Sequence, residues 1–333
     1  MGQLEGKTIL VTGGTGSFGN KFVPMTLREF NPEKVIVFSR DEMKQWYMSK
    51  AYANDPRVRF FIGDVRDDRR LKRALEGVDI VVHAAATKIV PTAEYNPFEA
   101  VKTNILGAMN LIDACLDVGV RKVVALSTDK ASSPVNLYGA TKMTSDKLFV
   151  AANNYSGAKD CQFSVVRYGN VMGSRGSVIP FFLDLPVGSK VPITDPRMTR
   201  FMITLEEGVR LVWQALMNSS RGEVLVKKIP SMSVLEIAEA LRPDLETEIV
   251  GIRPGEKLHE QMISIDEANQ TWDYGDHFRI LPSTQSTPSA EMLALAKPVP
   301  EGFSYASNTN PDWMSAEQLQ DWVSKNKAAI GNL

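Results

Sequence analysis

The sequence predicts an α/β fold built on a doubly wound parallel sheet, with a smaller C-terminal lobe. Three observations support this. Short apolar runs, often rich in β-branched residues, alternate with helix-like stretches through the first half of the chain. The runs are continuously apolar, which is typical of strands that helices bury on both faces. A glycine-rich loop also joins the first run to the first helical stretch.

The expected elements follow in chain order. Strands are expected at residues 7–13, 34–39, 58–64, 79–86, 122–128 and 163–171, and helices at about 19–30, 67–76, 97–118 and 138–155. Beyond residue 171 the elements become shorter, with more Gly and Pro. We therefore expect one domain over residues 1–171 and a lobe over residues 172–333, parts of which return to the sheet. The stretch 283–311 is rich in Pro, Ser, Thr and Asn and is predicted to be a loop-like wrap.

Composition indicates a soluble globular protein. The chain has 333 residues, 44% hydrophobic and 23% charged, and its formal net charge of -1 gives no field to attract nucleic acid or an anionic membrane. The first strand-like run begins at Lys7, which leaves no room for a signal peptide, and no apolar run is long enough to span a membrane. We expect a cytoplasmic protein that binds neither nucleic acid nor membrane.

The cysteines and histidines predict neither a disulfide nor a metal site. Cys115 and Cys161 each lie inside an apolar run and are expected to be buried free thiols. His83, His259 and His277 are scattered, with no Cys or carboxylate at metal-ligand spacing. We expect His83 to lie in the core.

The glycine-rich loop predicts a dinucleotide site in a Rossmann-type domain. In "VTGGTGSFGNKF", Gly13, Gly16 and Gly19 fit G-x-x-G-x-x-G, and an overlapping G-x-G-x-x-G begins at Gly14. Glycines let the backbone approach a pyrophosphate, and the following helix supplies N–H groups at its positive end. A glycine-rich structural turn is the alternative, but strand, loop and helix stand together here in a βαβ unit.

The residues after the second expected strand favour NADP over NAD. An acidic residue at this place would bind the ribose 2′-OH of NAD. This chain instead has Ser39 and Arg40, with Lys44 one helical turn on, and a cation suits the 2′-phosphate of NADP. Asp41 and Glu42 leave NAD open, because a small shift of the loop could bring one of them to the ribose.

The ends of the third and fourth expected strands supply further candidate contacts. "GDV" at 63–65 contains Asp64 and Val65, and "AAA" at 84–86 contains Ala84 and Ala86. The adenine and the nicotinamide ribose of a cofactor would pass these strand ends. Close packing of sheet and helix is the alternative for the alanines. Lys88 follows the fourth strand at a level where it could touch cofactor or substrate.

Tyr138 and Lys142 share one face of the predicted helix 138–155. That helix begins beside the carboxyl end of the strand 122–128, which ends in Thr128, and open α/β sheets bind ligands at this edge. A Lys near a phenol lowers the pKa of the phenol and makes it a base toward a hydroxyl group. The Lys could also hydrogen-bond the nicotinamide ribose. The pattern thus predicts a redox site with Tyr138 as base.

Together, "TGGTGSFG", "STDK" and "YGATK" resemble the extended short-chain dehydrogenase/reductase family of nucleotide-sugar enzymes. In that family the 4-epimerases have small residues after the strand-end Thr, and the retaining 4,6-dehydratases have Asp-Glu. Asp129-Lys130 is similar to the inverting UDP-N-acetylglucosamine 4,6-dehydratases, which begin pseudaminic acid synthesis. The likeness covers nearly the whole chain, through "FFIGDVRD", "AEYNP", "RYGNVMGSRGSVIPFF", "ITDPRMTRF", "RPGEKLHE" and "SYASNTN".

The resemblance implies dehydration through a transient ketone, with NADP recycled internally. Tyr138 would take the C4 hydroxyl proton while hydride leaves C4, and the new ketone would acidify the C5 hydrogen. Lys130 would remove that hydrogen as a proton, its pKa lowered by burial and neighbouring cations. A protonated Asp129 would donate to the departing C6 hydroxyl, hydride would return to C6, and reprotonation from the opposite face would invert C5. A turn cap is the alternative for Asp129, and a solvated loop cation for Lys130.

The resemblance also implies which residues hold the ligands. Arg253 would bind the UDP diphosphate and Glu256 the ribose hydroxyls. Other substrate contacts are implied for Lys88, Asn170, Val178, Thr194 and Arg200. Cofactor contacts are implied for Gly13, Gly16, Ser17, Phe18, Gly19, Ser39, Arg40, Lys44, Asp64, Val65, Ala84, Ala86, Lys88, Tyr138, Lys142 and Val171. A homo-oligomer is implied, with a hexamer favoured over a dimer. Ile89 departs from the family, which often has His there, and bears on the fine sugar preference.

Four alternatives stay open at this point. A capsule-type 4,6-dehydratase/5-epimerase shares "STDKA" and "TRF", but tends to have Met in place of Tyr138. A UDP-hexose 4-epimerase would leave Lys130 without a role. A retaining 4,6-dehydratase would keep the C5 configuration and give Lys130 a different task. A non-catalytic NADP-sensing module on the same fold would have no need to keep the Thr, Asp, Lys and Tyr together.

Overall fold

One large sheet forms the centre of the molecule. The computed structural model describes residues 4–157, 159–283, 294–328 and 330–331, and within them ten strands form this sheet. From edge to edge they are β16 (Lys297–Pro298), β14 (Thr271–Asp273), β15 (His277–Ile280), β10 (Val224–Lys227), β6 (Gln162–Arg167), β5 (Lys122–Leu126), β4 (Ile80–His83), β1 (Thr8–Thr12), β2 (Lys34–Ser39) and β3 (Val58–Ile62). The strands from β3 to β10 run parallel, and β15, β14 and β16 continue the sheet antiparallel.

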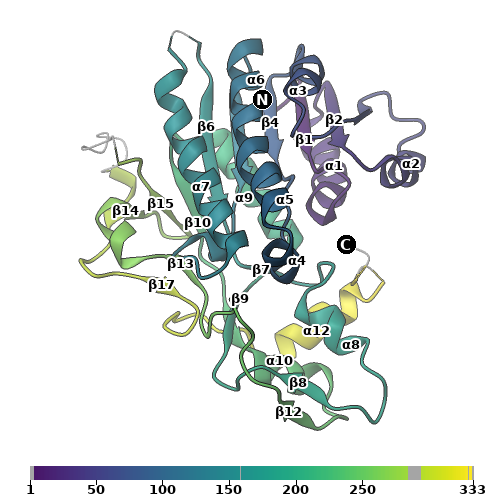
Figure 1. Cartoon of the computed structure of the whole chain (residues 1–333), viewed down its shortest axis with the longest axis vertical. Helices are drawn as coiled ribbons and strands as arrows, with labels where there is room; N and C mark the ends of the chain where they lie inside the picture. The colour runs from purple at the N-terminus through teal and green to yellow at the C-terminus, as the bar shows by residue number, and fades with distance from the viewer. Residues whose placement is uncertain (1–3, 158, 284–293, 329, 332–333) are drawn as a thin grey trace.

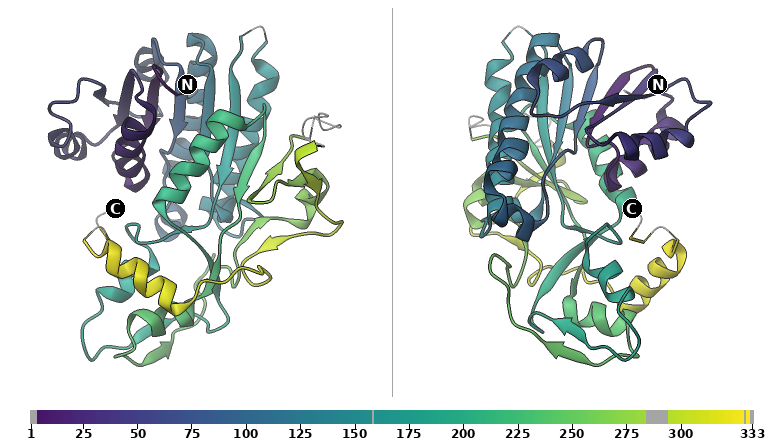
Figure 2. Two further views of the ribbon diagram at one scale, coloured as in Figure 1. Left: turned by 180° about the vertical axis from the view of Figure 1, so that it is seen from behind. Right: turned by 45° about the vertical axis from the view of Figure 1, so that its right-hand side comes forward.

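Helices cover both faces of the sheet, which confirms the predicted fold class (Figures 1 and 2). They are α1 (Ser17–Phe30), α2 (Glu42–Lys50), α3 (Asp68–Leu75), α4 (Val90–Tyr95), α5 (Pro97–Val101), α6 (Gly107–Val118), α7 (Leu137–Ala152) and α9 (Leu205–Asn218). The α3, α6 and α7 helices pack side by side on one face, and α1 packs on α9 on the other. Trp213 of α9 donates from Nε1 to Thr26 Oγ1 of α1 at 3.0 Å, which ties the second pair together.

The first five predicted strands are confirmed as β1 to β5, but the sixth is wrong in its second half. β6 ends at Arg167, and the next residues form β7 (Asn170–Val171), which pairs with β9 (Thr199–Ile203) in a separate sheet. Gly169 makes this change of direction possible, because a Cβ at this position would collide with the Phe201 side chain. The chain therefore leaves the large sheet just where the site begins.

The helices also differ from the prediction in two ways. The predicted helix 97–118 is interrupted by a π-helical turn at Lys102–Leu106, where buried Asn104 donates to Thr87 O and to Thr141 Oγ1, both at 3.0 Å. The short helices α2 and α4 were not predicted, and neither was the 14-residue α9, which lies beyond the last predicted helix. The remaining short turns are 3₁₀-helical, at Asp129–Ala131, Asn153–Tyr155 and Ile265–Gln270.

A smaller lobe, called the lower lobe below, lies beneath the large sheet in Figure 1, and it has an apolar core of its own. Its elements are α8 (Val178–Leu183), α10 (Val234–Leu241), α12 (Ala316–Asn326), β8 (Val191–Ile193), β11 (Ser231–Ser233) and β12 (Thr247–Ile249). Later segments return to the sheet domain, and the division at residue 171 stays a prediction. Of the predicted wrap 283–311, residues 284–293 lie outside the described residues. The rest is not all loop, because β16 joins the large sheet and β17 (Tyr305–Ala306) pairs with β13 (Gln261–Ile263).

The buried polar groups of the sheet domain follow the predictions made for them. Cys115 and Cys161 are buried free thiols, as predicted. His83 is 1% exposed and its Nδ1 lies 2.8 Å from Thr12 Oγ1, so it is a core residue. Among the described helices, none combines the length and apolar character needed to cross a membrane.

Candidate active site

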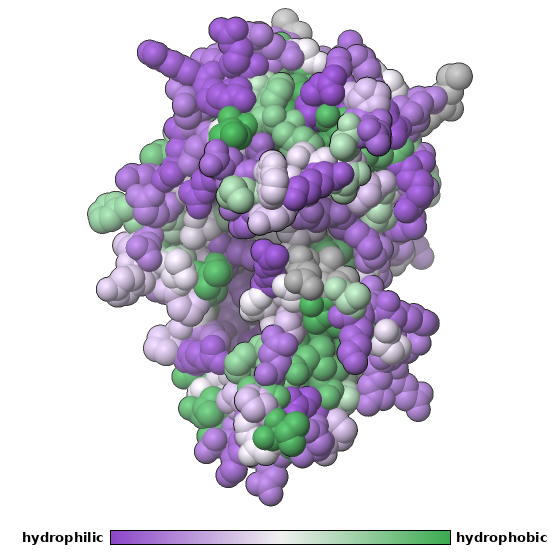
Figure 3. All heavy atoms as spheres, turned by 90° about the vertical axis from the view of Figure 1, so that its right-hand side faces the viewer, coloured by the Kyte–Doolittle hydropathy of each residue, from purple (hydrophilic) through white to green (hydrophobic). Residues whose placement is uncertain are grey.

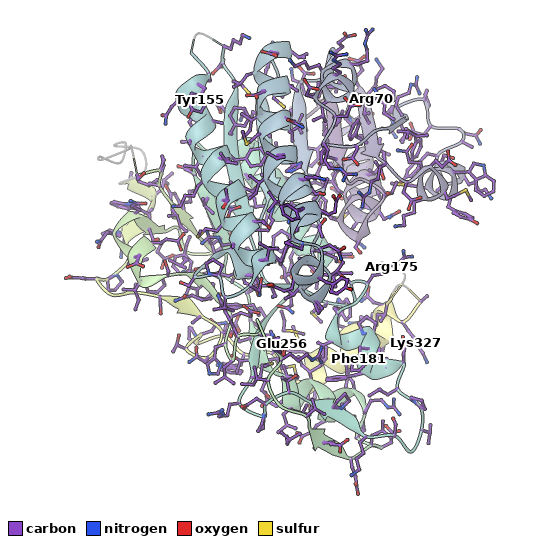
Figure 4. The ribbon with its side chains drawn as sticks, in the orientation of Figure 1. Arg70, Tyr155, Arg175, Phe181, Glu256 and Lys327 are labelled. Atoms are coloured by element: carbon purple, nitrogen blue, oxygen red, sulfur yellow. The ribbon has the colours of Figure 1, made fainter. Side chains whose placement is uncertain are left out.

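A cavity of about 860 Å³ lies between the carboxyl ends of the parallel strands and the lower lobe. Figure 3 looks onto a recessed, largely hydrophilic face between the two parts, and Figure 4 shows Glu256 and Arg175 at the level of this gap. All the predicted site residues line the cavity except Gly19 and Thr194: Gly13, Gly16, Ser17, Phe18, Ser39, Arg40, Lys44, Asp64, Val65, Ala84, Ala86, Lys88, Thr128, Asp129, Lys130, Tyr138, Lys142, Asn170, Val171, Val178, Arg200, Arg253 and Glu256.

The two exceptions have structural explanations. Gly19 lies in the first turn of α1, where a Cβ would collide with the backbone of Gly14, so its smallness serves the packing of helix on loop. Thr194 directly follows β8 in the lower lobe and is 8% exposed. The structure therefore does not bring Thr194 into the cavity lining.

The glycine loop has the form of a phosphate cradle. Gly13 has a φ of 65°, and a Cβ there would lie 2.8 Å from the backbone of Ala85. Gly16 is the N-cap of α1 and offers no side chain to the helix, and no acidic residue stands in the first turn. The N–H groups at this end of the helix are thus left for an anion. The loop fits a dinucleotide pyrophosphate.

Cations border the place where the adenosine ribose of a dinucleotide would lie. Arg40 and Lys44 have side chains that are 66% and 53% exposed. The Asp41 carboxylate accepts from the Lys44 backbone N–H at 3.0 Å as the N-cap of α2, and its Oδ2 lies 3.2 Å from Lys44 Nζ. Ser39 Oγ lies 2.8 Å from Thr15 Oγ1. Asp41 keeps its charge in the cap and pairs with Lys44, and Arg40 lies 3.8 Å from Asp64 Oδ2, so this edge carries two exposed cations beside two carboxylates.

Thr128, Asp129 and Lys130 follow β5 and lie close to Tyr138, which stands in the first turn of α7. The Thr128 hydroxyl donates to Asp129 Oδ1 at 2.8 Å, and Lys130 Nζ donates to the same oxygen at 3.1 Å. Asn136 caps α7 by accepting from the Gly139 N–H at 2.8 Å. Gly139 has no side chain to collide with the Lys130 carbonyl, so the helix packs directly against the Asp-Lys turn. These contacts bring Tyr138 and Lys130 into one site.

The structure adds a residue that was quoted in "RPGEKLHE" but given no role. Glu260 lines the same cavity, is 2% exposed, and places Oε1 2.9 Å from Lys130 Nζ. Its backbone is fixed just ahead of β13, since its N–H donates to Ser307 Oγ at 2.9 Å. A signal was present in the motif, since a carboxylate sits at its end, but the closeness to Lys130 arises only from folding. Other lining residues without a predicted role include Thr15, Asn136, Tyr168, Arg175 and Lys257.

The protonation of this cluster differs from the prediction. Burial disfavours the Lys130 ammonium, but the Asp129 and Glu260 carboxylates outweigh burial and raise the pKa of Lys130. The expected fall in its pKa is therefore wrong for this structure. Despite burial, Lys130 and Arg200 lower the pKa of Glu260, which keeps its charge. Burial instead raises the pKa of Asp129, as a proton-donating acid requires.

Tyr138 and Lys142 are both buried. Burial raises the pKa of Tyr138 to about 12, against the opposing effects of Lys130 and the Thr128 hydroxyl. The predicted net lowering of the Tyr138 pKa is thus wrong here: a neighbouring lysine does act to lower it, but burial outweighs that effect. Burial also lowers the pKa of Lys142, against the attraction of Asp146 one turn further along α7.

The cavity also contains the residue that departs from the family pattern. Ile89 lines it and is 58% exposed, beside Lys88, whose pKa is lowered by burial. Within the residues that the structure describes, no cluster of His, Cys, Asp or Glu is arranged to hold a metal ion.

The fold and the site define an extended short-chain dehydrogenase/reductase with a dinucleotide loop and a Tyr-Lys pair beside one cavity. The chain belongs to the polysaccharide biosynthesis protein family, whose model matches residues 9–282. It is 53% identical over 329 residues to a UDP-N-acetylglucosamine 4,6-dehydratase (inverting) of Campylobacter jejuni, covering 96% of this chain and 98% of that protein. It is also 43% identical to a UDP-glucose 4-epimerase of Rickettsia canadensis, covering 82% of each.

Solved structures agree on the architecture. Pen from Bacillus thuringiensis superposes with a TM-score of 0.88 at 37% identity, covering 98% of this chain and 99% of that one. DesIV, a dTDP-glucose 4,6-dehydratase from Streptomyces venezuelae solved with NAD, gives a TM-score of 0.68 at 27% identity, covering 75% of this chain and 86% of that one. The likeness to Pen therefore extends over the lower lobe as well as the sheet domain.

Proposed function

We propose that this chain is a UDP-N-acetylglucosamine 4,6-dehydratase that inverts C5 and begins pseudaminic acid synthesis. Its product would be UDP-2-acetamido-2,6-dideoxy-beta-L-arabino-hex-4-ulose. The observation that carries the proposal is the meeting of Asp129, Lys130 and Tyr138 in the cavity that also holds the glycine loop. The Campylobacter relative with the same printed activity supports it.

The residues present fit NADP as the resident cofactor. The Gly13–Phe18 loop would hold the pyrophosphate, and Arg40 and Lys44 the 2′-phosphate. When bound, NADP would accept hydride from C4 and return it to C6, so that net redox is zero. Mass spectrometry of nucleotide released from the purified protein tests this preference. We expect NADP(H), and NAD(H) alone would overturn it.

Three side chains of the site would each carry out a different proton transfer. Tyr138 would accept the C4 hydroxyl proton and Lys130, as the free amine, the C5 proton. Asp129 would give its proton to the C6 hydroxyl, which leaves as water. Lys130 Nζ lies 3.1 Å from Asp129 Oδ1, so the C5 proton could pass on and restore the acid. C5 must then regain a proton, and the proton that Tyr138 took from the C4 hydroxyl accounts for it. Delivery of a proton to the face of C5 opposite the one that lost it would invert the configuration.

The lower lobe offers partners for the nucleotide. Arg253 suits the diphosphate and Glu256 the ribose hydroxyls, and their side chains stand 3.8 Å apart on one loop. Asn170 Oδ1 is buried, finds no hydrogen-bond partner among the described residues, and belongs to a residue that lines the cavity, as a substrate contact would require. Arg200 and Val178 complete this side. Thr194 is withdrawn from the substrate set, because it lies outside the lining.

A homo-oligomer remains part of the proposal, with a hexamer favoured over a dimer. Large apolar side chains stand exposed on α4, α5, the π-helical turn, α6 and α7: Tyr95, Phe98, Leu106, Met109 and Met143. The other four elements all contact α7, so we call these side chains the exposed apolar patch, and exposed apolar surface of this kind supports contact with another protein surface. The cytoplasmic location expected from the sequence stays a prediction.

The test is incubation of purified protein with UDP-N-acetylglucosamine, followed by mass spectrometry and NMR of the nucleotide sugar. We expect a product lighter by one water. The Rickettsia relative makes a 4-epimerase the second candidate, and an unchanged mass with a C4 isomer would establish it. Retention at C5 would leave a retaining dehydratase, and several C5 epimers a capsule-type enzyme. Bound cofactor without turnover of any UDP-sugar would indicate a sensing module.

A further inference from the structure

The pairing of Lys130 with Glu260 is the feature of the site that the proposed reaction does not explain. A C5 base must be a free amine when it acts, yet Lys130 is held between two carboxylates. Asp129 is accounted for as the acid. Glu260 comes from a different segment and is 2% exposed, and within the described part of the chain its second oxygen has no hydrogen-bond partner. Burying a carboxylate is unfavourable unless a nearby cation pairs with it, and here that cation is Lys130.

The charges around Glu260 come from four segments. Lys130 and Asp129 belong to the turn after β5, and Arg200 of β9 has Nε 3.9 Å from Glu260 Oε1. Lys257 belongs to the same loop as Glu260 and donates to Ser132 O at 2.6 Å. Tyr138 faces the cluster from α7. Of these, Lys130 is the partner at hydrogen-bond distance from the Glu260 side chain.

We infer that Glu260 is a positioning residue that sets the protonation state of Lys130. In the open site its carboxylate holds Lys130 as an ammonium ion; when substrate displaces water, it takes one proton from Lys130. This inference rests on the proposed function. Lys130 would thus become a free amine, and so a base, only when substrate occupies the site.

The proton transfer is balanced within the pair. A Lys130 N–H bond breaks, an O–H bond forms on Glu260 Oε1, and the electron pair stays on nitrogen as the lone pair that removes the C5 proton. The total charge does not change, because an ion pair becomes a neutral pair. Desolvation penalises both ions and not the neutral pair, so exclusion of water by the substrate favours the transfer.

The test compares Glu260→Gln with the wild-type enzyme across the neutral pH range. The near-isosteric amide can hold Lys130 but cannot take its proton. We expect kcat near neutral pH to fall about 100-fold with a smaller change in KM. We also expect kcat to rise about tenfold per pH unit, because Lys130 must lose its proton to solvent, whereas the wild-type kcat stays flat. Glu260→Asp should restore part of the flat profile. Glu239→Gln, an exposed change in the same lobe, is the control.

A second readout does not depend on turnover. The Lys130 side chain is 24% exposed, so its reaction with an acylating reagent can be followed by peptide mass spectrometry. Loss of the Glu260 charge should make Lys130 react faster near neutral pH. An unchanged pH profile together with unchanged labelling in Glu260→Gln would overturn the inference. A wild-type enzyme that leaves UDP-N-acetylglucosamine intact would overturn the proposed function instead, and the labelling would still decide the role of Glu260.

Discussion

At the scale of single residues, burial sets the chemistry of the site. Asp129 and Lys130 are neighbours in sequence, yet burial favours the neutral form of Asp129 while two carboxylates favour the charged form of Lys130. Their environments therefore differ: Asp129 can hold a proton to give, whereas Lys130 is held as an ammonium ion and must lose a proton before it can act as a base. In the proposed elimination Asp129 would give its proton to the departing C6 hydroxyl, and Lys130, once deprotonated, would remove the C5 hydrogen.

Asp129→Asn should stop the reaction after the first oxidation. Its amide cannot give a proton to the C6 hydroxyl, so kcat should fall by about 100- to 10,000-fold. Tyr138 is intact, so the C4 step should still proceed, and absorbance of reduced nicotinamide should accumulate with substrate in single-turnover experiments. Full activity in the variant would remove Asp129 from the acid role.

Because of His83, the free energy of unfolding of the protein should fall in mild acid. Burial, with a smaller effect of Lys142, lowers its pKa from 6.5 to about 3, so its neutral form is held in the folded state. The unfolded chain binds the proton first, so this stability is complete above about pH 6.5 and is lost as the pH falls toward 3. By about pH 5 the loss should reach about 2 kcal/mol in urea unfolding.

The matched variant is His83→Gln, which keeps a polar group near Thr12 and removes the titration. It should be less stable than the wild type at neutral pH but should lack this part of the acid-dependent loss. Equal pH dependence in the two proteins would show that His83 titrates normally.

At the scale of elements, the start of α7 couples the catalytic turn to the nucleotide loop. Asn136 caps the helix that carries Tyr138, and its Nδ2 donates to Gly255 O at 2.8 Å, beside Glu256. The same side chain thus supports both the base and the loop proposed to hold UDP. Replacing it should affect stability and substrate binding separately.

Asn136→Ala should lower the free energy of unfolding by about 1 kcal/mol, because the cap of α7 is lost. Asn136→Ser should restore most of that stability, since serine can cap, but it cannot reach Gly255. Its KM for the UDP-sugar should therefore stay raised. Chemical denaturation and steady-state kinetics of the two variants measure this, and a normal KM in Asn136→Ser would contradict the link.

The parts of the fold that the sequence predicted are those with a local signal. The strands β1, β2, β4 and β5 are largely apolar runs, the edge strand β3 is apolar except for Arg59, and the glycine loop has a fixed spacing, so these features could be predicted from the sequence. In α2 only Gln45 and Met48 are buried, and its sequence carries little apolar periodicity. The break after β6 depends on the approach of Gly169 to Phe201, which no local pattern shows.

The same division holds for the site. Residues at strand ends and on the Tyr-Lys helix face were predicted because topology places them at one edge of the sheet. The partnership of Lys130 with Glu260 joins segments far apart in the sequence, and the pKa directions follow from burial. Both depend on tertiary structure. For this reason the predicted pKa shifts of Lys130 and of Tyr138 had the wrong direction.

At the scale of the whole molecule, the sheet domain and the lower lobe meet around one cavity. The first supplies the dinucleotide loop and the proton-transfer groups, and the second supplies Arg200, Arg253 and Glu260. The structural likeness to Pen covers both the sheet domain and the lower lobe, so the two parts occur together in that structure as well.

The exposed apolar patch should be an interface between copies of the chain. Phe98 is 78% exposed, and Phe98→Glu would place a charge in the patch and should lower the assembly state while leaving the fold intact. Light scattering coupled to size-exclusion chromatography measures the mass. Tyr155→Glu, an exposed aromatic on the 3₁₀-helical turn after α7, is the control. A wild-type protein that is a monomer would contradict the proposed oligomer.

The central claim is that Asp129 and Lys130 turn a redox site into one that eliminates water and inverts C5. Proton NMR of the purified protein with UDP-N-acetylglucosamine in D₂O, with no cofactor added, tests it most directly. We predict a 6-deoxy-4-keto sugar that carries deuterium at an inverted C5. Unchanged C5 configuration would contradict the inversion, and the absence of any dehydrated sugar would contradict the claim as a whole.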